Sequence, residues 1–331
     1  MRIAVIGAGA VGGAMAALLH RGGHEIEVTA RGAHLDAIRE SGIRLGGAWG
    51  SHVAPVAAGE VLTVAPELVI VTTKAQDAAA AITANLSVIG EAPILVVQNG
   101  LDGIAIARLA APLSPVVGGL AMFAASFLSP GEVTITTANP TFLGGDDAAV
   151  VKAVAKVLGA VMPVTRVDDF AGAQWTKLVV NQINALPAVT GLSVQDTIAH
   201  RGLRRVLTTS MRESVDVANA LGVRFASLGG LGRARLGLFS ALPIGAAEAL
   251  PRLMRRRMGT TPNPGSTLQS LRRGQPTEVD YLNGAVVAAG LRAGVPTPVN
   301  ALIVRLVHEV EASKAFLVPE VVVARVATAS E

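Results

Sequence analysis

The chain contains no cysteine among its 331 residues. This absence excludes disulfide scaffolds, thiolate metal sites, iron–sulfur clusters and cysteine nucleophiles. Aromatic residues make up only 3% of the chain, and none lies in the arginine-rich stretch 252–257. We therefore interpret that stretch as a solvated helix face or an oligomer contact, and expect no nucleic-acid partner. The formal net charge is only +4, which suits small anionic ligands.

Lysine is scarce as well. Five lysines stand among 28 basic residues, at positions 74, 152, 156, 177 and 314. Because arginine serves wherever any cation suffices, a lysine among polar neighbours is a candidate for chemistry that needs a removable proton.

The chain also lacks an unbroken apolar run of the about 20 residues that a membrane-spanning helix needs. Prolines and glycines interrupt the uncharged stretch 109–131, which we interpret as a buried strand followed by a loop. The stretch 3–20 resembles the apolar part of a signal peptide, but its four glycines favour a strand-to-helix turn. We therefore expect a cytoplasmic protein without a membrane segment.

The length favours two domains, because single cores rarely grow beyond about 250–300 residues. In the first half, short apolar runs alternate with Ala-rich segments. Strands are predicted at 3–6, 26–29, 68–72, 94–97, 116–117, 133–137 and 141–143, and helices at 11–21, 33–41, 75–86, 104–109 and 148–158. This alternation is typical of a doubly wound parallel sheet covered on both faces.

Strand-like runs vanish near residue 168, and long apolar-periodic segments follow. Helices are predicted at 170–186, 203–221, 234–258, 277–293 and 300–312. The stretch 259–265, GTTPNPG, must be a loop. The sequence thus predicts an α/β fold, with a doubly wound sheet domain at 1–168 and an all-helical domain at 169–331.

A glycine-rich turn joins the first predicted strand to the first helix. It reads Gly7-Ala8-Gly9-Ala10-Val11-Gly12 and fits GxGxxG within a complete βαβ unit. The first glycine permits the turn, the second lets the backbone approach a pyrophosphate, and the third lets helix and strand pack closely. The first domain is therefore predicted to be a Rossmann-type dinucleotide-binding domain.

The second strand ends in Thr29-Ala30-Arg31, without the acidic residue that would bind a ribose 2′-OH. The Arg31 guanidinium can bind a 2′-phosphate, so NADP(H) is favoured over NAD(H). A solvated loop charge is the alternative for Arg31. Lys74 follows the third strand and suits the cofactor or an anionic substrate.

Hydride transfer to a ketone creates an alkoxide, which needs stabilisation and a proton. Lys177 shares a helix face with Asn181, four residues on, and with Asn184, seven residues on. A partly buried lysine has a lowered pKa and can polarise a carbonyl and donate a proton. The alternative is a lysine that extends from the helix edge into solvent. Further polar clusters lie at 97–100 and 266–283.

All six histidines fall in helix, turn or terminal contexts without polar neighbours, and we interpret them as surface or helix-end residues. No group of His, Asp and Glu has the spacing of metal ligands. We expect no metal site.

Seven short motifs are spread over nearly the whole chain. They are GAGAVG at 7–12, VTTKAQD at 71–77, VQNG at 97–100, SPGEV at 129–133, WTKLVVN at 175–181, TEVDYLNGAVV at 277–287 and GVPTPVN at 294–300. Together they resemble the ketopantoate reductase (2-dehydropantoate 2-reductase) family. The resemblance implies an oxidoreductase that uses NADPH to reduce the 2-oxo acid 2-dehydropantoate to (R)-pantoate, in pantothenate and coenzyme A biosynthesis.

The resemblance also implies roles by matched position. Lys177 would be the general acid, Glu278 would bind the substrate hydroxyl and hold Lys177, and Asn99 would lie between nicotinamide and substrate. The other implied positions are Asn181, Asn263 and Ser266 for the substrate, and the glycine-rich turn, Lys74 and Arg31 for the cofactor, with Arg31 on the 2′-phosphate.

One position departs from the family. A second asparagine is expected eight residues after the lysine, where this chain has Ala185. The nearest substitute is Asn184, which is rotated by about 100° on a helix. The motifs thus indicate the type of reaction and leave the identity of the substrate open. The alternatives are a reductase of another branched 2-oxo acid and a non-catalytic NADP(H)-binding sensor or interaction protein. The apolar helices of the second domain suit either a homodimer interface or packing on the first domain.

Overall fold

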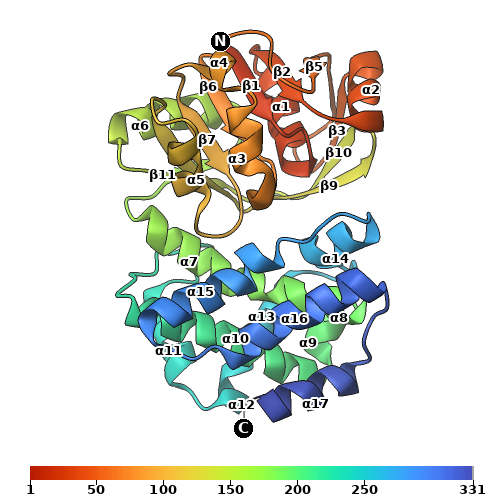
Figure 1. Cartoon of the computed structure of the whole chain (residues 1–331), viewed down its shortest axis with the longest axis vertical. Coiled ribbons are helices and arrows are strands. Elements are labelled where there is room, and N and C mark those ends of the chain that lie inside the picture. The colour runs from red at the N-terminus through yellow and green to blue at the C-terminus, as the bar shows by residue number, and fades with distance from the viewer. Residues whose placement is uncertain (330–331) are drawn as a thin grey trace. The chain divides into compact units, whose positions relative to one another are not determined.

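The chain folds into two compact units, Met1–Phe170 and Ala171–Glu331, in a computed structural model that describes residues 1–329. Figure 1 shows both units, with most of their helices and strands labelled. The first unit combines strands with helices and the second is built of helices, so the predicted fold class is confirmed.

Within the described residues, the main sheet of the first unit has eight strands in the order β12-β11-β8-β7-β6-β1-β2-β5. All neighbouring pairs are parallel except β8 and β11, which are antiparallel. The strands are β1 (Arg2–Ile6), β2 (Glu25–Thr29), β5 (Ala57–Gly59), β6 (Leu68–Val71), β7 (Ile94–Val97), β8 (Val116–Ala121), β11 (Thr141–Gly144) and β12 (Val164–Arg166).

Helices cover both faces of this sheet. Ile3 and Val5 of β1 belong to one hydrophobic core, which contains residues of α1 (Ala10–Arg21), α2 (Gly32–Ser41) and α6 (Ala148–Gly159). Ala4 and Ile6 belong to the other core, with residues of α3 (Ala75–Thr83), α4 (Leu86–Ile89) and α5 (Gly103–Ala110). Because successive side chains of a strand point to opposite faces, a strand buried on both sides must be apolar throughout.

A second sheet in the first unit was not expected. It has four strands among the described residues, in the order β4-β3-β10-β9, and α1 packs against all four. The strands are β3 (Ile43–Gly47), β4 (His52–Ala54), β9 (Ala124–Ser129) and β10 (Glu132–Thr137). The sequence predicts only β10 as a strand, because three glycines interrupt the apolar alternation between residues 43 and 54.

In the second unit, the other helices pack around the long helix α10 (Arg201–Ala220). This helix contacts α9, α11, α12, α13, α15, α16 and α17. The other elements are α7 (Phe170–Asn181), η1 (Gln182–Asn184), α8 (Ala185–Thr190), α9 (Val194–Ala199), α11 (Arg233–Ala241), α12 (Ile244–Ala247), α13 (Ala249–Arg257), α14 (Gly265–Arg272), η2 (Val279–Tyr281), α15 (Asn283–Ala293), α16 (Pro298–Ser313) and α17 (Pro319–Ala329).

Three segments predicted as single helices are broken. The first, 170–186, narrows into the 3₁₀ turn η1 one turn before Pro187, which has no N–H to donate back along the helix. The second, 234–258, breaks at Leu242, which is extended (ψ 149°) because it precedes Pro243. The third, 277–293, is a bend at Glu278, then the turn η2, then α15.

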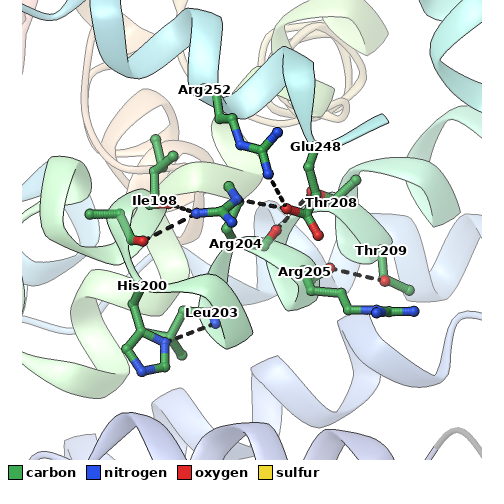
Figure 2. Close-up of polar contacts among 10 residues, drawn as sticks. Ile198, His200, Leu203, Arg204, Arg205, Thr208, Thr209, Glu248 and Arg252 are labelled. Carbon is green, nitrogen blue, oxygen red and sulfur yellow. Dashed lines mark hydrogen bonds and ion pairs between the residues drawn. The ribbon is translucent and has the colours of Figure 1, made fainter. Parts of the chain in front are cut away.

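A buried ion pair ties the helices around α10 together, as Figure 2 shows. Glu248 accepts hydrogen bonds from Arg204 Nε (2.7 Å) and from Arg252 Nη2 (2.9 Å). Arg204 Nη1 also donates to the carbonyl oxygens of Ile198 (2.9 Å) and Ala199 (3.1 Å), at the C-terminal end of α9. The forked guanidinium thus joins three helices, a task that the point charge of lysine performs poorly.

Among residues 1–329, no helix combines the length and the apolar character that crossing a membrane requires.

Candidate active site

The glycine-rich turn lies between β1 and α1. Gly7 has a left-handed backbone (φ 98°), which an L side chain rarely adopts. Its N–H donates to Thr29 Oγ1 (3.0 Å), and its carbonyl accepts from Thr72 Oγ1 (2.6 Å). Thr29 ends β2 and Thr72 follows β6, so both strands next to β1 hold the turn in place.

The two later glycines of the turn meet different surroundings. A Cβ on Gly12 would lie 2.1 Å from the Gly7 carbonyl oxygen, whereas a Cβ on Gly9 would meet nothing within 4 Å. Gly12 therefore allows α1 to pack on the turn, and Gly9 leaves open space at the N-terminus of α1. No side chain of the described residues caps this helix end. Free N–H groups facing open space fit the pyrophosphate of a dinucleotide.

Arg31 lies two residues beyond the end of β2, at the N-cap position of α2, and its side chain is exposed. Neither α1 nor α2 has an acidic residue in its first turn. The Arg31 guanidinium therefore follows β2, the strand whose Thr29 supports the glycine-rich turn. The first turns of α1 and α2 contain no acidic side chain that would repel an anion bound here.

His34 was expected to lack polar neighbours, and that expectation is wrong. Gly131 N donates to His34 Nδ1 (3.0 Å), so the ring hydrogen is on Nε2, which donates to the Ala8 carbonyl (2.7 Å). The ring also packs edge-on against Phe127. His34 therefore joins the glycine-rich turn to the β9–β10 hairpin. Neither partner is near it in sequence, so no local pattern could have revealed this role.

Lys74 and Asn99 lie just beyond the carboxyl ends of two neighbouring parallel strands. Lys74 precedes α3 after β6, and Asn99 follows β7; both are half-buried. Between them, Gln98 Nε2 donates to the Thr73 carbonyl (2.7 Å) and fastens the two loops together. These two residues therefore share the sheet edge at which doubly wound proteins bind their ligands.

Lys177 lies on α7 in the second unit, half-buried among apolar neighbours. Burial lowers the pKa of its ammonium from 10.5 to about 8, and the charge of Glu278 opposes this by raising it. A lysine in this state loses its proton far more readily than one in water. Glu278, in the bend before η2, is thus the carboxylate whose charge favours the protonated form of Lys177.

The turn that carries Glu278 is attached to α16 through side chains. Glu311 Oε1 accepts from Thr277 N (2.8 Å), and His308 Nε2 lies 3.0 Å from Asp280 Oδ1. His308 Nδ1 also lies 2.6 Å from Glu311 Oε2. These hydrogen bonds to two carboxylates raise the pKa of His308, although burial lowers it. His308 was thus wrongly expected to lack polar neighbours.

Lys177 and Asn181 lie four residues apart on α7, so these two share a helix face as expected. Asn184 lies beyond the end of α7 in the 3₁₀ turn η1, so the regular helix face expected to join it to Lys177 is interrupted. The Asn184 carboxamide lies against the start of α14, because its Oδ1 would be 2.9 Å from a Cβ on Gly265. Ala185 points into the core and is only 2% exposed.

Asn263 and Ser266 lie at the same end of α14. Asn263 Oδ1 accepts a hydrogen bond from Gly265 N (2.9 Å). The backbone carbonyl of Asn263 accepts from Val194 N, and its backbone N–H donates to Gln195 Oε1. The structure thus brings Asn184 close to the predicted substrate loop, which the start of α9 holds in place. Gln195 was missed, because a lone glutamine on a short helix gives no signal in the sequence.

Comparisons with known proteins match both units. The model of the ketopantoate reductase PanE/ApbA family matches residues 3–147, and that of its C-terminal domain matches residues 169–311. The 2-dehydropantoate 2-reductase of Archaeoglobus fulgidus is 27% identical over 94% of this chain and 98% of its own length. That of Mesorhizobium japonicum is 28% identical over 93% and 97%.

Solved structures resemble the chain over most of its length. A PanE/ApbA family ketopantoate reductase from Ralstonia eutropha JMP134 has a TM-score of 0.81 at 28% identity, covering 95% of this chain and 99% of that one. A ternary structure of D-mandelate dehydrogenase with NADH and anilino(oxo)acetate has a TM-score of 0.80 at 22% identity, with the same coverage. At that identity the likeness shows the fold alone.

Proposed function

This chain belongs to the ketopantoate reductase family, and we propose that it uses NADPH to reduce 2-dehydropantoate to (R)-pantoate. The observation that carries the proposal is Lys177, an ammonium that burial has made acidic and that Glu278 influences. A surface lysine would show no such shift, and a protein that only binds the dinucleotide has no use for it.

The first unit fits a pyridine nucleotide. Gly9 leaves space for a pyrophosphate at the N-terminus of α1, and the Arg31 guanidinium can hold a 2′-phosphate in a bidentate manner. When bound, the nicotinamide supplies the hydride. NADPH is the preferred hydride donor, because Arg31 follows β2 at the place where NAD-dependent proteins have a carboxylate that binds the ribose 2′-OH.

Lys177 supplies the proton. Reduction of a ketone leaves negative charge on the carbonyl oxygen, and an ammonium beside that oxygen both stabilises the charge and neutralises it. With a pKa of about 8, Lys177 is about 90% protonated at pH 7. It is nevertheless a stronger acid than an ordinary lysine, and Glu278 keeps enough positive charge on it for the next turnover.

Asn184, Asn263 and Ser266 at the start of α14, together with Asn181 at the end of α7, would orient the substrate. They offer amides and a hydroxyl, which suit the carboxylate and hydroxyl of a small 2-oxo acid. On the cofactor side, Asn99 would hold the reacting carbonyl toward the nicotinamide.

A second candidate is the reduction of a different branched or aryl 2-oxo acid. Ala185 favours it, since a buried methyl group replaces the carboxamide that the family has there. Asn184 is displaced toward Gly265 and would meet the far end of the substrate from another direction.

NADPH oxidation measured with a panel of 2-oxo acids tests both candidates. The panel contains 2-dehydropantoate, other branched 2-oxo acids and arylglyoxylates. We expect 2-dehydropantoate to have the highest kcat/KM, and a clearly better substrate would establish the second candidate instead. Lys177→Ala and the charge-conserving Lys177→Arg should each lower kcat by about 10²- to 10⁴-fold. Unchanged turnover in Lys177→Ala would refute the mechanism.

Arg31→Ala tests the cofactor. It should weaken NADPH binding by about 10- to 150-fold, the equivalent of a charged hydrogen bond, and leave NADH binding unchanged. An equal loss for both cofactors would mean that Arg31 does not bind the 2′-phosphate.

A further inference from the structure

A buried hydrogen bond joins the two chain segments that carry Lys177 and Glu278. Gln182 follows Lys177 by five residues, and Asn283 follows Glu278 by five. Asn283 Nδ2 donates to Gln182 Oε1 at 2.6 Å, and both side chains are completely buried. The bond therefore spans 101 residues of sequence to connect the two halves of the proposed proton donor site.

Each end of this bond is firmly connected to its own functional residue. Gln182 Nε2 donates to the Leu178 carbonyl (3.0 Å), which fixes the carboxamide to the helix of Lys177. On the other side, the Glu278 carbonyl accepts from Tyr281 N (3.0 Å) and Leu282 N (3.1 Å). A displacement of Asn283 is thus passed to Glu278 through a hydrogen-bonded turn, not through a flexible loop.

The orientation of the pair is determined by its surroundings. Asn300 Nδ2 donates to the Ser210 carbonyl (3.1 Å) and to Glu213 Oε2 (2.6 Å). Asn300 Oδ1 must then point the other way, where it accepts from Asn283 Nδ2 (2.9 Å). A flipped Asn283 would place its oxygen against the oxygens of both Gln182 and Asn300, so only one orientation of the Asn283 amide presents a donor to both acceptors.

Through the Asn300 carboxamide, the pair is also connected to the carboxyl group of Glu213 on α10. Glu213 accepts from the backbone N–H groups of Val299 and Asn300 (2.9 Å each), at the start of α16. Burial and the charge of Asp216 raise the pKa of Glu213, while these hydrogen bonds lower it. On the outer side of the Glu278 turn, the charged groups are those of Asp280, His308 and Glu311, described above.

This cluster is costly for folding alone. It places four amide or hydroxyl side chains and a carboxyl group in an apolar interior, and Asn283 Oδ1 has no partner among residues 1–329. An apolar core of the same shape would avoid both costs. Such a cluster is reasonable where an exact spacing matters more than stability.

We propose that Gln182 and Asn283 are positioning residues, and that their hydrogen bond sets the separation between the Lys177 ammonium and the Glu278 carboxylate. The inference rests on the proposed role of Lys177 as proton donor. Glu278 raises the pKa of Lys177 against the effect of burial. Moving two charges from about 4 to about 5 Å apart at an effective dielectric of about 20 lowers the lysine pKa by about half a unit.

The test compares variants that break the bond with one that does not. Gln182→Met and Asn283→Leu replace the amides with apolar side chains of similar size. Gln182→Asn is milder, because it keeps an amide but shortens its reach. The matched control is Thr208→Ala on α10, which removes a buried hydroxyl whose hydrogen bond within residues 1–329 goes to the Arg204 carbonyl of its own helix.

Two measurements are made on each folded variant. The first is the pH dependence of kcat, whose falling limb near pH 8 reports the deprotonation of Lys177. The second needs no turnover: the chain has only five lysines, so ε-¹³C-lysine NMR can follow Lys177 directly. Lys177→Arg identifies its signal.

We expect Gln182→Met and Asn283→Leu to lower the Lys177 pKa by about half a unit in both measurements. Gln182→Asn should give a smaller shift in the same direction, and Thr208→Ala none. Wild-type titration in the bond-breaking variants, or an equal shift in Thr208→Ala, would overturn the proposal. Should both apolar variants fail to fold, Gln182→Asn decides. If the wild type reduces no 2-oxo acid, the proposed function fails, and the NMR titration still decides the positioning role.

Discussion

Two alanine substitutions in the glycine-rich turn should separate cofactor binding from folding. A Cβ at position 9 would meet nothing within 4 Å, and Gly9 has an ordinary φ of −67°. A Cβ at position 12 would lie 2.1 Å from the Gly7 carbonyl oxygen and 2.2 Å from Thr72 Oγ1. Such separations are far below van der Waals contact, and one of the two neighbours is backbone, which has little freedom to move.

Gly9→Ala should leave the free energy of unfolding within about 1 kcal/mol of wild type. Alanine is a poorer N-cap than glycine by about 0.5–1 kcal/mol. The reduced entropy of the unfolded chain offsets about 0.4–1 kcal/mol of this. The added methyl group occupies the space proposed for the pyrophosphate. Losing one hydrogen bond to a charged phosphate costs about 1.5–3 kcal/mol, so the Kd for NADPH should rise about 10- to 150-fold.

Gly12→Ala should behave differently, because it damages the turn itself. Overpacking of this kind costs about 1–3 kcal/mol. For a unit of this size that corresponds to a decrease in Tm of about 3–10 °C. Cofactor binding should fall as well, since α1 must move away from the turn.

Thermal unfolding without cofactor, followed by circular dichroism, and calorimetric titration with NADPH separate the two effects. Gly9→Ala should have the Tm of wild type and a raised Kd for NADPH, whereas Gly12→Ala should have both a lower Tm and a raised Kd. Wild-type NADPH affinity in Gly9→Ala would refute the placement of the phosphates at this turn. A large loss of Tm in Gly9→Ala would refute the reasoning from open space.

Four further outcomes are expected. Because protonated Lys177 is the donor, kcat should be constant below its pKa of about 8 and fall as the pH rises through that value; a steady-state pH profile that stays flat to pH 10 would contradict this. Glu248→Gln should lower the free energy of unfolding by about 3 kcal/mol, because it leaves the guanidinium of Arg204 buried without its counter-ion. Arg252→Ala, which removes the exposed partner of the same carboxylate, should cost less than about 1 kcal/mol in the same denaturant titration. His34→Phe keeps the ring but loses both hydrogen bonds, so the NADPH Kd should rise about tenfold with little change in Tm; equal affinity would exclude a role for His34 in shaping the turn.

The parts of the fold that depend on local pattern were predictable. Continuous apolar strands followed by Ala-rich helices indicated the main sheet, and the glycine-rich turn could be located by its spacing alone. The second sheet was not predictable, because β3 contains two glycines and pairs with β10, a strand 88 residues further along the chain. The break in 234–258 was readable in principle from Pro243, whose ring forces the residue before it into an extended conformation.

The candidate site divides in the same way. Lys177 and Glu278 stood out because they are ionisable residues within motifs. The structure adds that the charge of Glu278 raises the pKa of Lys177. His34, Gln195 and the Gln182–Asn283 bond did not stand out, since each acts on a partner that is distant in sequence. The hydrogen-bond partner of a neutral polar side chain that is flanked by apolar residues cannot be predicted from the sequence, because only the fold brings the two groups together.

The pairing of β3 with β10 also governs the order in which the first unit is completed. Arg44 and Glu132, which face each other across these strands, are 88 residues apart. At a synthesis rate of about 5–20 residues per second, β3 and β4 emerge roughly 5–20 s before the strand that completes their sheet. Throughout that interval one edge of β3 is unpaired and open to other chains. Recombinant yield should therefore depend on translation speed and on chaperone supply more than the equilibrium stability of the finished protein suggests.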